Sequence, residues 1–130
     1  MIVVDASAMI EALVGRDADP ELLDHLAGEV AAPHLLDVEV LSGLRGLVAG
    51  GSLALATAEQ ARADFAELTV VRVATGPLAD RMWELRHQYA AYDACYLSLA
   101  EGLGAPLVTC ARKLSVPGHH AEVLVYPRSR

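Results

Sequence analysis

The sequence predicts an α/β fold, a sandwich with a central parallel sheet of about four or five strands and helices on both faces. Short apolar or β-branched runs alternate along the chain with segments whose apolar residues recur at helical spacing. The first run, residues 1–4, has no polar alternation, which is typical of a parallel strand covered on both faces. A chain of 130 residues suits one domain, expected over residues 1–130.

Four elements are expected in the N-terminal half of the chain. They are a helix over residues 7–14, a helix over 19–28, a strand over 30–33 and a long helix over 34–49. Ser7 is the predicted cap of the first helix, and Pro20 suits the first turn of the second. The glycine pair at 50–51 is expected to end the long helix.

The C-terminal half continues the alternation of helix and strand. The expected elements are helices over residues 57–68, from 77 to about 86 and from 93 to about 103, with strands over 69–73, 106–109 and 122–126. Thr57 with Gln60 resembles a capping box, and Pro77 suits a first helical turn. Asp93 is placed as the first residue of the last helix.

Charge and composition exclude several classes of protein. The formal charge of −7 argues against a broad basic face for nonspecific nucleic-acid binding, although it leaves room for a local basic rim. Cys95 and Cys110 lack a CxxC spacing, so reduced, buried thiols are expected and a zinc site is not. No basic leader and no apolar stretch of ~20 residues is present, so we expect a cytoplasmic protein without a membrane partner.

Three acidic residues stand in apolar surroundings: Asp5, Glu39 and Asp93. Asp5 follows the first strand, and in open α/β sheets ligands bind at the carboxyl ends of strands. Glu39 lies on the long helix, which is expected to be buried nearly all round, and Arg45 is an alternative partner for it. Asp5 and Asp93 could equally be helix caps.

Convergence of these three carboxylates would create strong mutual repulsion, because each raises the free energy of the others' charged form. A hard divalent cation relieves that repulsion. Oxygen-only ligands without histidine or cysteine favour Mg²⁺ or Mn²⁺ over zinc. The sequence therefore predicts an acidic metal site if Asp5, Glu39 and Asp93 meet.

Three motifs along the chain resemble those of the PIN-domain ribonucleases, in particular the VapC-like toxins of bacterial type II toxin-antitoxin pairs. The motifs are IVVDASA at residues 2–8, PHLLDVEV at 33–40 and YDACYLSLA at 92–100. Each is weak alone, but their order and spacing cover essentially the whole chain. The resemblance implies that Asp5, Glu39 and Asp93 are catalytic, metal-binding carboxylates. It also implies that Ser7 and Thr109 are supporting hydroxyls.

One departure from the family pattern concerns its last motif, which usually reads Thr, any residue, Asp, two residues, then Leu or Phe. Here it reads Thr109 to Leu114 with Ala111 in place of the fourth acid. A second cation should therefore bind more weakly, and activity could be attenuated. Asp37 is no replacement, because two residues from Glu39 on a helix it points to the opposite side.

The activity that the resemblance implies is Mg²⁺- or Mn²⁺-dependent hydrolysis of phosphodiester bonds in RNA (tRNA, rRNA or mRNA), by an endoribonuclease. Candidate contacts to the RNA backbone are the cationic residues Arg45, Arg86, Arg112 and Lys113, which could equally be ordinary surface charges. The implied partners are a cognate VapB-like antitoxin and a second copy of the chain in a homodimer.

Two alternatives differ in class from an enzyme. A PIN-like domain weakened by Ala111 could act as a binding module that engages an antitoxin and RNA without turnover. A receiver-like signalling domain shares the alternating architecture, but it expects paired acids after the first strand and a lysine after a late strand. Asp5 stands alone and Lys113 is offset from its strand, so this alternative ranks last.

Overall fold

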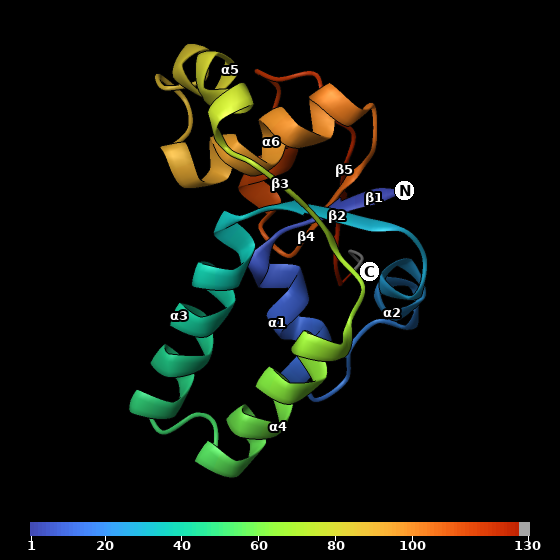
Figure 1. The fold of residues 1–130 in the computed structure, drawn as a ribbon, viewed down its shortest axis with the longest axis vertical. Helices are drawn as coiled ribbons and strands as arrows, with labels where there is room; N and C mark the ends of the chain where they lie inside the picture. Colours follow the sequence, from blue (N-terminus) through green and yellow to red (C-terminus); the bar gives the residue numbers. More distant parts are fainter. Residues whose placement is uncertain (128–130) are drawn as a thin grey trace.

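The computed structural model describes residues 1–127 and contains a five-stranded, wholly parallel sheet (Figure 1). Its strands are β1 (Ile2–Val4), β2 (Val30–Pro33), β3 (Val71–Val73), β4 (Leu107–Thr109) and β5 (Val123–Val125). Their spatial order is β3-β2-β1-β4-β5, so the first strand of the chain lies at the centre. The predicted parallel sheet is confirmed.

Six α-helices surround the sheet within residues 1–127. They are α1 (Ala6–Val14), α2 (Pro20–Ala27), α3 (Leu35–Ala49), α4 (Leu55–Glu67), α5 (Ala79–Glu84) and α6 (Ala91–Leu103). Short 3₁₀ turns, η1 (Gly76–Leu78) and η2 (Arg112–Ser115), precede α5 and follow β4. Figure 1 shows α5 and α6 on one side of the sheet and α1, α3 and α4 on the other, which confirms the predicted layers.

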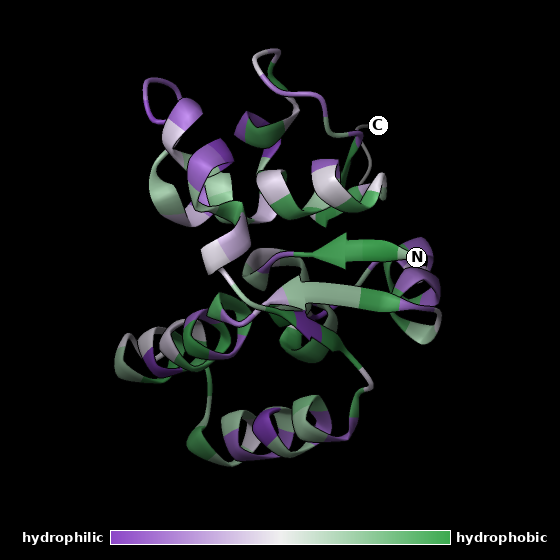
Figure 2. Ribbon diagram, turned by 45° about the horizontal axis from the view of Figure 1, so that its top comes forward, coloured by the Kyte–Doolittle hydropathy of each residue, from purple (hydrophilic) through white to green (hydrophobic). Residues whose placement is uncertain are grey.

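The core lies between the sheet and α6 on one face and between the sheet and α1 on the other. All three residues of β1 are buried, and so is every residue of α6 from 94 to 100. Figure 2 shows the central strands in the hydrophobic colours. A central parallel strand has no solvent-exposed face, which explains why β1 is apolar without alternation.

Three predicted helix starts were wrong. The N-cap of α1 is Asp5 rather than Ser7, and its carboxylate accepts a hydrogen bond from the Ala8 amide. Helix α4 begins at Leu55, so Thr57 and Gln60 form no capping box. Helix α6 begins two residues before Asp93, which lies inside its first turn. A capping side chain can be assigned only when the backbone around it is known, because several neighbouring polar residues fit the same pattern.

The long helix α3 is less buried than its composition suggests. It buries Leu36, Val40 and Leu44, but Val38 and Leu41 are 65% and 48% exposed. The prediction of burial nearly all round was therefore wrong. Gly43 lies against Ile10 of α1 so closely that a Cβ atom would overlap that side chain. Within residues 1–127, no helix is long and apolar enough to cross a membrane.

Candidate active site

Asp5 occupies the carboxyl end of the central strand, at the entry to α1. Strand β1 ends at Val4, and the next residue both leaves the sheet and caps the helix. Only 5% of Asp5 is exposed. The buried apolar strand thus delivers a carboxylate to the edge of the sheet where ligands of parallel α/β folds bind.

Two hydroxyls hold the Asp5 carboxylate from opposite oxygens. The Ser7 hydroxyl donates to Oδ1 at 2.7 Å, and the Thr109 hydroxyl at the end of β4 donates to Oδ2. Each hydroxyl in turn accepts a backbone N–H, at 2.9 Å: that of Cys110 for Ser7 and that of Ala111 for Thr109. These contacts fix the orientation of the carboxylate and explain the two hydroxyls that the sequence singled out.

Burial dominates the electrostatics of Asp5. Removal from water raises the pKa of its carboxyl group, and the negative charge of Asp93 raises it further. Hydrogen bonds from Thr109, Ala8 and Ser7 oppose this effect without cancelling it. Within residues 1–127 no ion pair reaches Asp5. Asp5 is therefore a buried carboxylate that forms no ion pair within residues 1–127, although the charge of Lys113 acts on it from a longer distance.

Glu39 approaches from α3 and is held by Tyr96 of α6. The Tyr96 hydroxyl donates to Glu39 Oε1 at 2.7 Å, whereas Arg45, the alternative partner, makes no ion pair with Glu39 in the described chain. Burial raises the pKa of the Tyr96 phenol well above its usual range, and the charges of Glu39 and Asp5 act in the same direction. Tyr96 therefore lies close enough to Glu39 and Asp5 for both negative charges to raise the pKa of its phenol.

Tyr96 is the site residue that sequence reasoning missed. It lies three residues after Asp93 on α6, so the two share a helical face, and it is 2% exposed. A tyrosine buried to that extent needs a partner for its hydroxyl. The sequence could therefore have indicated that the Tyr96 hydroxyl bonds to some group of the site. Which group it bonds to depends on how α3 packs beside α6.

Asp93 carries the one ion pair of the site within residues 1–127. Lys113 Nζ, from the turn η2 after β4, lies 3.0 Å from Asp93 Oδ2. The hydrogen bond with Asp93 raises the pKa of the Lys113 ammonium, and the charges of Asp93 and Asp5 act in the same direction. The structure therefore places one of the four predicted RNA-backbone cations directly on an acid of the site.

Arg86 and Arg45 make no ion pair with these acids in the described residues. Arg86 lies over the ring of Trp83, 4.6 Å from its centroid, and donates to the Trp83 carbonyl. Arg112 opens the turn η2, and Arg45 lines a groove on α3. Asp37 forms a bidentate pair with Arg72 of β3, at 2.7 and 2.8 Å. The prediction that Asp37 points away from Glu39 agrees with this pairing.

The donor set of the site can be compared with the divalent cation that the family resemblance implies. Asp5, Glu39 and Asp93 offer only carboxylate oxygens, which hard divalent cations prefer. Within residues 1–127, no three His, Cys, Asp or Glu side chains are gathered as a ligand cluster: Glu39 is bonded to Tyr96, and Asp93 is paired with Lys113. The donor chemistry, and an Asp5 that forms no ion pair within residues 1–127, fit such an ion.

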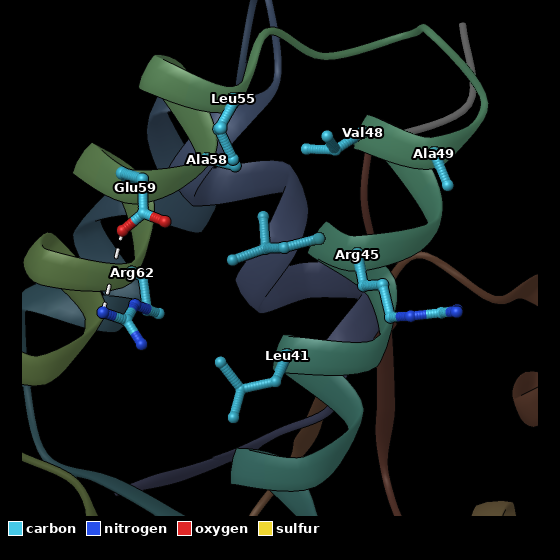
Figure 3. Close-up of a pocket in the computed structure, with 9 residues that line it drawn as sticks. Leu41, Arg45, Val48, Ala49, Leu55, Ala58, Glu59 and Arg62 are labelled. Atoms are coloured by element: carbon cyan, nitrogen blue, oxygen red, sulfur yellow. Dashed lines mark ion pairs between the residues drawn. The ribbon is translucent and has the colours of Figure 1, made fainter.

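Two hollows of the surface lie elsewhere, between α3 and α4. One has a volume of about 380 Å³ and another of about 640 Å³, and Leu41, Glu59 and Arg62 line both. Figure 3 shows Leu41 and Val48 of α3 facing Leu55 of α4 across the first of them. Both cysteines are free thiols, as predicted, but only Cys95 is fully buried.

Comparison with known proteins places this chain in a family. The model of the PIN domain matches residues 2–117. The chain is 40% identical over 129 residues to the VapC ribonuclease Mb0985 of Mycobacterium bovis, covering 98% of this chain and 100% of that protein. It is 37% identical over 125 residues to ribonuclease VapC12 of Mycobacterium tuberculosis, covering 95% and 97%.

Solved structures share the fold at lower identity. PAE2754 of Pyrobaculum aerophilum superposes with a TM-score of 0.70 at 24% identity, over 94% of this chain and 81% of that one. A toxin-antitoxin complex from Klebsiella pneumoniae gives 0.62 at 18% identity, over 96% and 97%. The predicted family is therefore confirmed: the chain belongs to the PIN-domain family, and its relatives within that family are VapC ribonucleases.

Proposed function

We propose that this protein is a metal-dependent endoribonuclease, the toxin of a VapBC-type toxin-antitoxin pair. The observation that carries the proposal is the Asp5 carboxylate, 5% exposed at the end of the central strand, held by two hydroxyls and without an ion pair in residues 1–127. Relatives that match nearly the full chain are named ribonucleases, which supports hydrolysis of RNA. We further propose that residues 1–130 act as one PIN-like domain.

The residues proposed to hold the cation are Asp5, Glu39 and Asp93. When bound, Mg²⁺ or Mn²⁺ supplies Lewis-acid polarisation of the phosphodiester and lowers the pKa of the attacking water. Ser7 and Thr109 keep Asp5 in one orientation, so no reorientation of that carboxylate is needed during the reaction. Tyr96 plays the same role for Glu39.

The proposed substrate is single-stranded or looped RNA, whose unstacked bases can be read individually. A net charge of −7 means that contacts to its phosphates depend on a few cations. Lys113, which lies at the site, is the first of these, and Arg86, Arg112 and Arg45 are proposed farther along the surface. In this proposal, these surface contacts determine whether the substrate is tRNA, rRNA or mRNA.

The proposed partners are a VapB-like antitoxin and a second copy of the chain, in the cytoplasm. The large exposed apolar side chains of α3 and α4 support a protein partner, because exposed apolar surface commonly marks an interaction site. Val38, Leu41 and Leu55 are 65%, 48% and 63% exposed. An antitoxin segment that covers the acidic site would silence the nuclease until it is removed.

A second candidate function is a PIN-like binding module with little turnover. The observation that favours it is Ala111, which follows β4 and contributes only its backbone N–H to the Thr109 hydroxyl. No fourth carboxylate comes from this position. Such a module would still bind antitoxin and RNA.

Cleavage of a mixed RNA pool by the purified chain tests the proposal. We expect cleavage that needs Mg²⁺ or Mn²⁺, stops with EDTA and is lost in Asp5→Asn. The matched control is Asp24→Asn, the same chemical change at an exposed position of α2, which should cleave like the wild type. Cleavage by Ala111→Asp alone would favour the binding module. Absence of RNA cleavage by every variant and by the wild type would overturn the nuclease proposal.

A further inference from the structure

Lys113 is the one cation that forms an ion pair with the acids of the site in the described chain. Its Nζ lies 3.0 Å from Asp93 Oδ2, and Asp5 also favours its charged form. Neither Asp5 nor Glu39 has an ion pair among residues 1–127. A positive charge belonging to the chain itself therefore stands beside Asp93 and acts electrostatically on Asp5, two of the three carboxylates proposed to hold the metal.

The backbone around Lys113 is tied to the same site. The turn η2 starts directly after Ala111, whose N–H bonds to the Thr109 hydroxyl that holds Asp5. Leu114, the next residue, is fully buried, and the Ser115 hydroxyl bonds back to the Arg112 carbonyl. These contacts fix the point from which the lysine side chain extends toward Asp93.

The charges of the site limit the number of divalent ions that it can hold. The three carboxylates carry three negative charges, and one divalent cation together with the Lys113 ammonium offsets all three. A second divalent ion, about 3.5–4 Å from the first as in two-metal sites, would leave an excess of positive charge and face repulsion from the ammonium.

We propose that Lys113 is the resident counter-cation of the acidic site, so that the site takes one divalent ion and the ammonium stands in for a second. This proposal rests on the proposed metal-dependent function. The ammonium has three N–H donors, so it can serve a phosphate oxygen of the substrate while it remains paired with Asp93. Lys113 is thus assigned a role that its exposed, flexible side chain alone would not reveal.

The competing explanation is an ordinary surface ion pair. The Lys113 side chain is 70% exposed, and exposed pairs commonly contribute little to stability. An ordinary pair of this kind would leave the number of bound ions unchanged when the lysine is removed. The two explanations therefore predict different numbers of bound ions when Lys113 is replaced.

Mn²⁺ binding to the full chain, followed by the electron paramagnetic resonance signal of free Mn²⁺ and without RNA, tests the proposal. We expect one ion per wild-type chain. In Lys113→Gln the first ion should bind about tenfold more tightly, because repulsion by a unit charge a few ångströms away is removed, and a second, weaker ion should appear. Lys113→Arg keeps the charge and should bind one ion like the wild type.

The matched control is Arg16→Gln, which removes the same charge beyond the far end of α1 and should leave Mn²⁺ binding unchanged. Two ions on the wild type, or identical titrations for Lys113→Gln and the wild type, would overturn the role of Lys113 while leaving the metal site intact. Absence of Mn²⁺ binding in the wild type would overturn the proposed metal dependence itself. Circular dichroism of each variant establishes that it is folded.

Discussion

The hydroxyl of Thr109 connects the end of β4 to the acid on β1, and Thr109→Val tests what that connection contributes to stability. Valine keeps the shape of threonine but can neither donate to Asp5 nor accept the Ala111 N–H. Thr109 is fully buried, so water cannot replace the lost partners. The substitution therefore removes the hydrogen bonds with Asp5 and Ala111, and the longer contact of 3.3 Å with the Ser7 hydroxyl, without leaving a cavity.

The expected destabilisation follows from these contacts. A hydrogen bond to a charged acceptor contributes about 1.5–3 kcal/mol, and a part-buried N–H left without a partner adds about 1 kcal/mol. Burial of a methyl group in place of the hydroxyl offsets about 1 kcal/mol. We expect the free energy of unfolding to fall by about 1.5–3 kcal/mol, a large share of the ~5–15 kcal/mol typical of a domain.

Urea denaturation followed by far-ultraviolet circular dichroism, at pH 7 with EDTA, measures this loss. The control is Thr57→Val, the same change at an exposed position of α4, which should lie within about 0.5 kcal/mol of the wild type. If Thr109→Val were no less stable than Thr57→Val, the hydroxyl would not be holding Asp5, and the reasoning about the site would be refuted.

Two further predictions concern α6. Arg81→Gln breaks the bidentate pair with Glu101, at 2.7 and 3.0 Å. The free energy of unfolding at pH 7 should fall by about 1–3 kcal/mol. Arg81 holds the pKa of Glu101 below 4.5, so this stabilisation is present above pH 4.5 and is lost as the pH falls through the lowered pKa. Urea denaturation from pH 7 to pH 3 should therefore show the difference from wild type shrinking, and a constant difference would contradict this assignment. Gly104→Ala should destabilise the protein by about 1 kcal/mol, because residue 104 has φ +60° at the end of the helix, whereas Gly102→Ala inside the helix should stabilise it by about 0.5–1 kcal/mol. Thermal denaturation compares the two alanine variants, and equal effects would argue against strain at residue 104.

Local patterns in the sequence determined the fold class. Apolar runs such as residues 1–4 and the glycine pair at 50–51 report on backbone conformation within a few residues, so strands and helix ends could be predicted without knowledge of the tertiary fold. Helix starts were harder, because Asp5 and Ser7 both suit a cap and the choice depends on the precise backbone path. The motifs around Asp5, Glu39 and Asp93 were sufficient to indicate the family.

The tertiary structure alone decided how each acid is held. Thr109 reaches Asp5 across 104 residues of chain, and Tyr96 reaches Glu39 across 57. Lys113 meets Asp93 only because the turn after β4 passes beside the first turn of α6. Hydrogen bonds and ion pairs act over a few ångströms, so their partners are set by the packing of β4, α3 and α6 rather than by any spacing along the sequence.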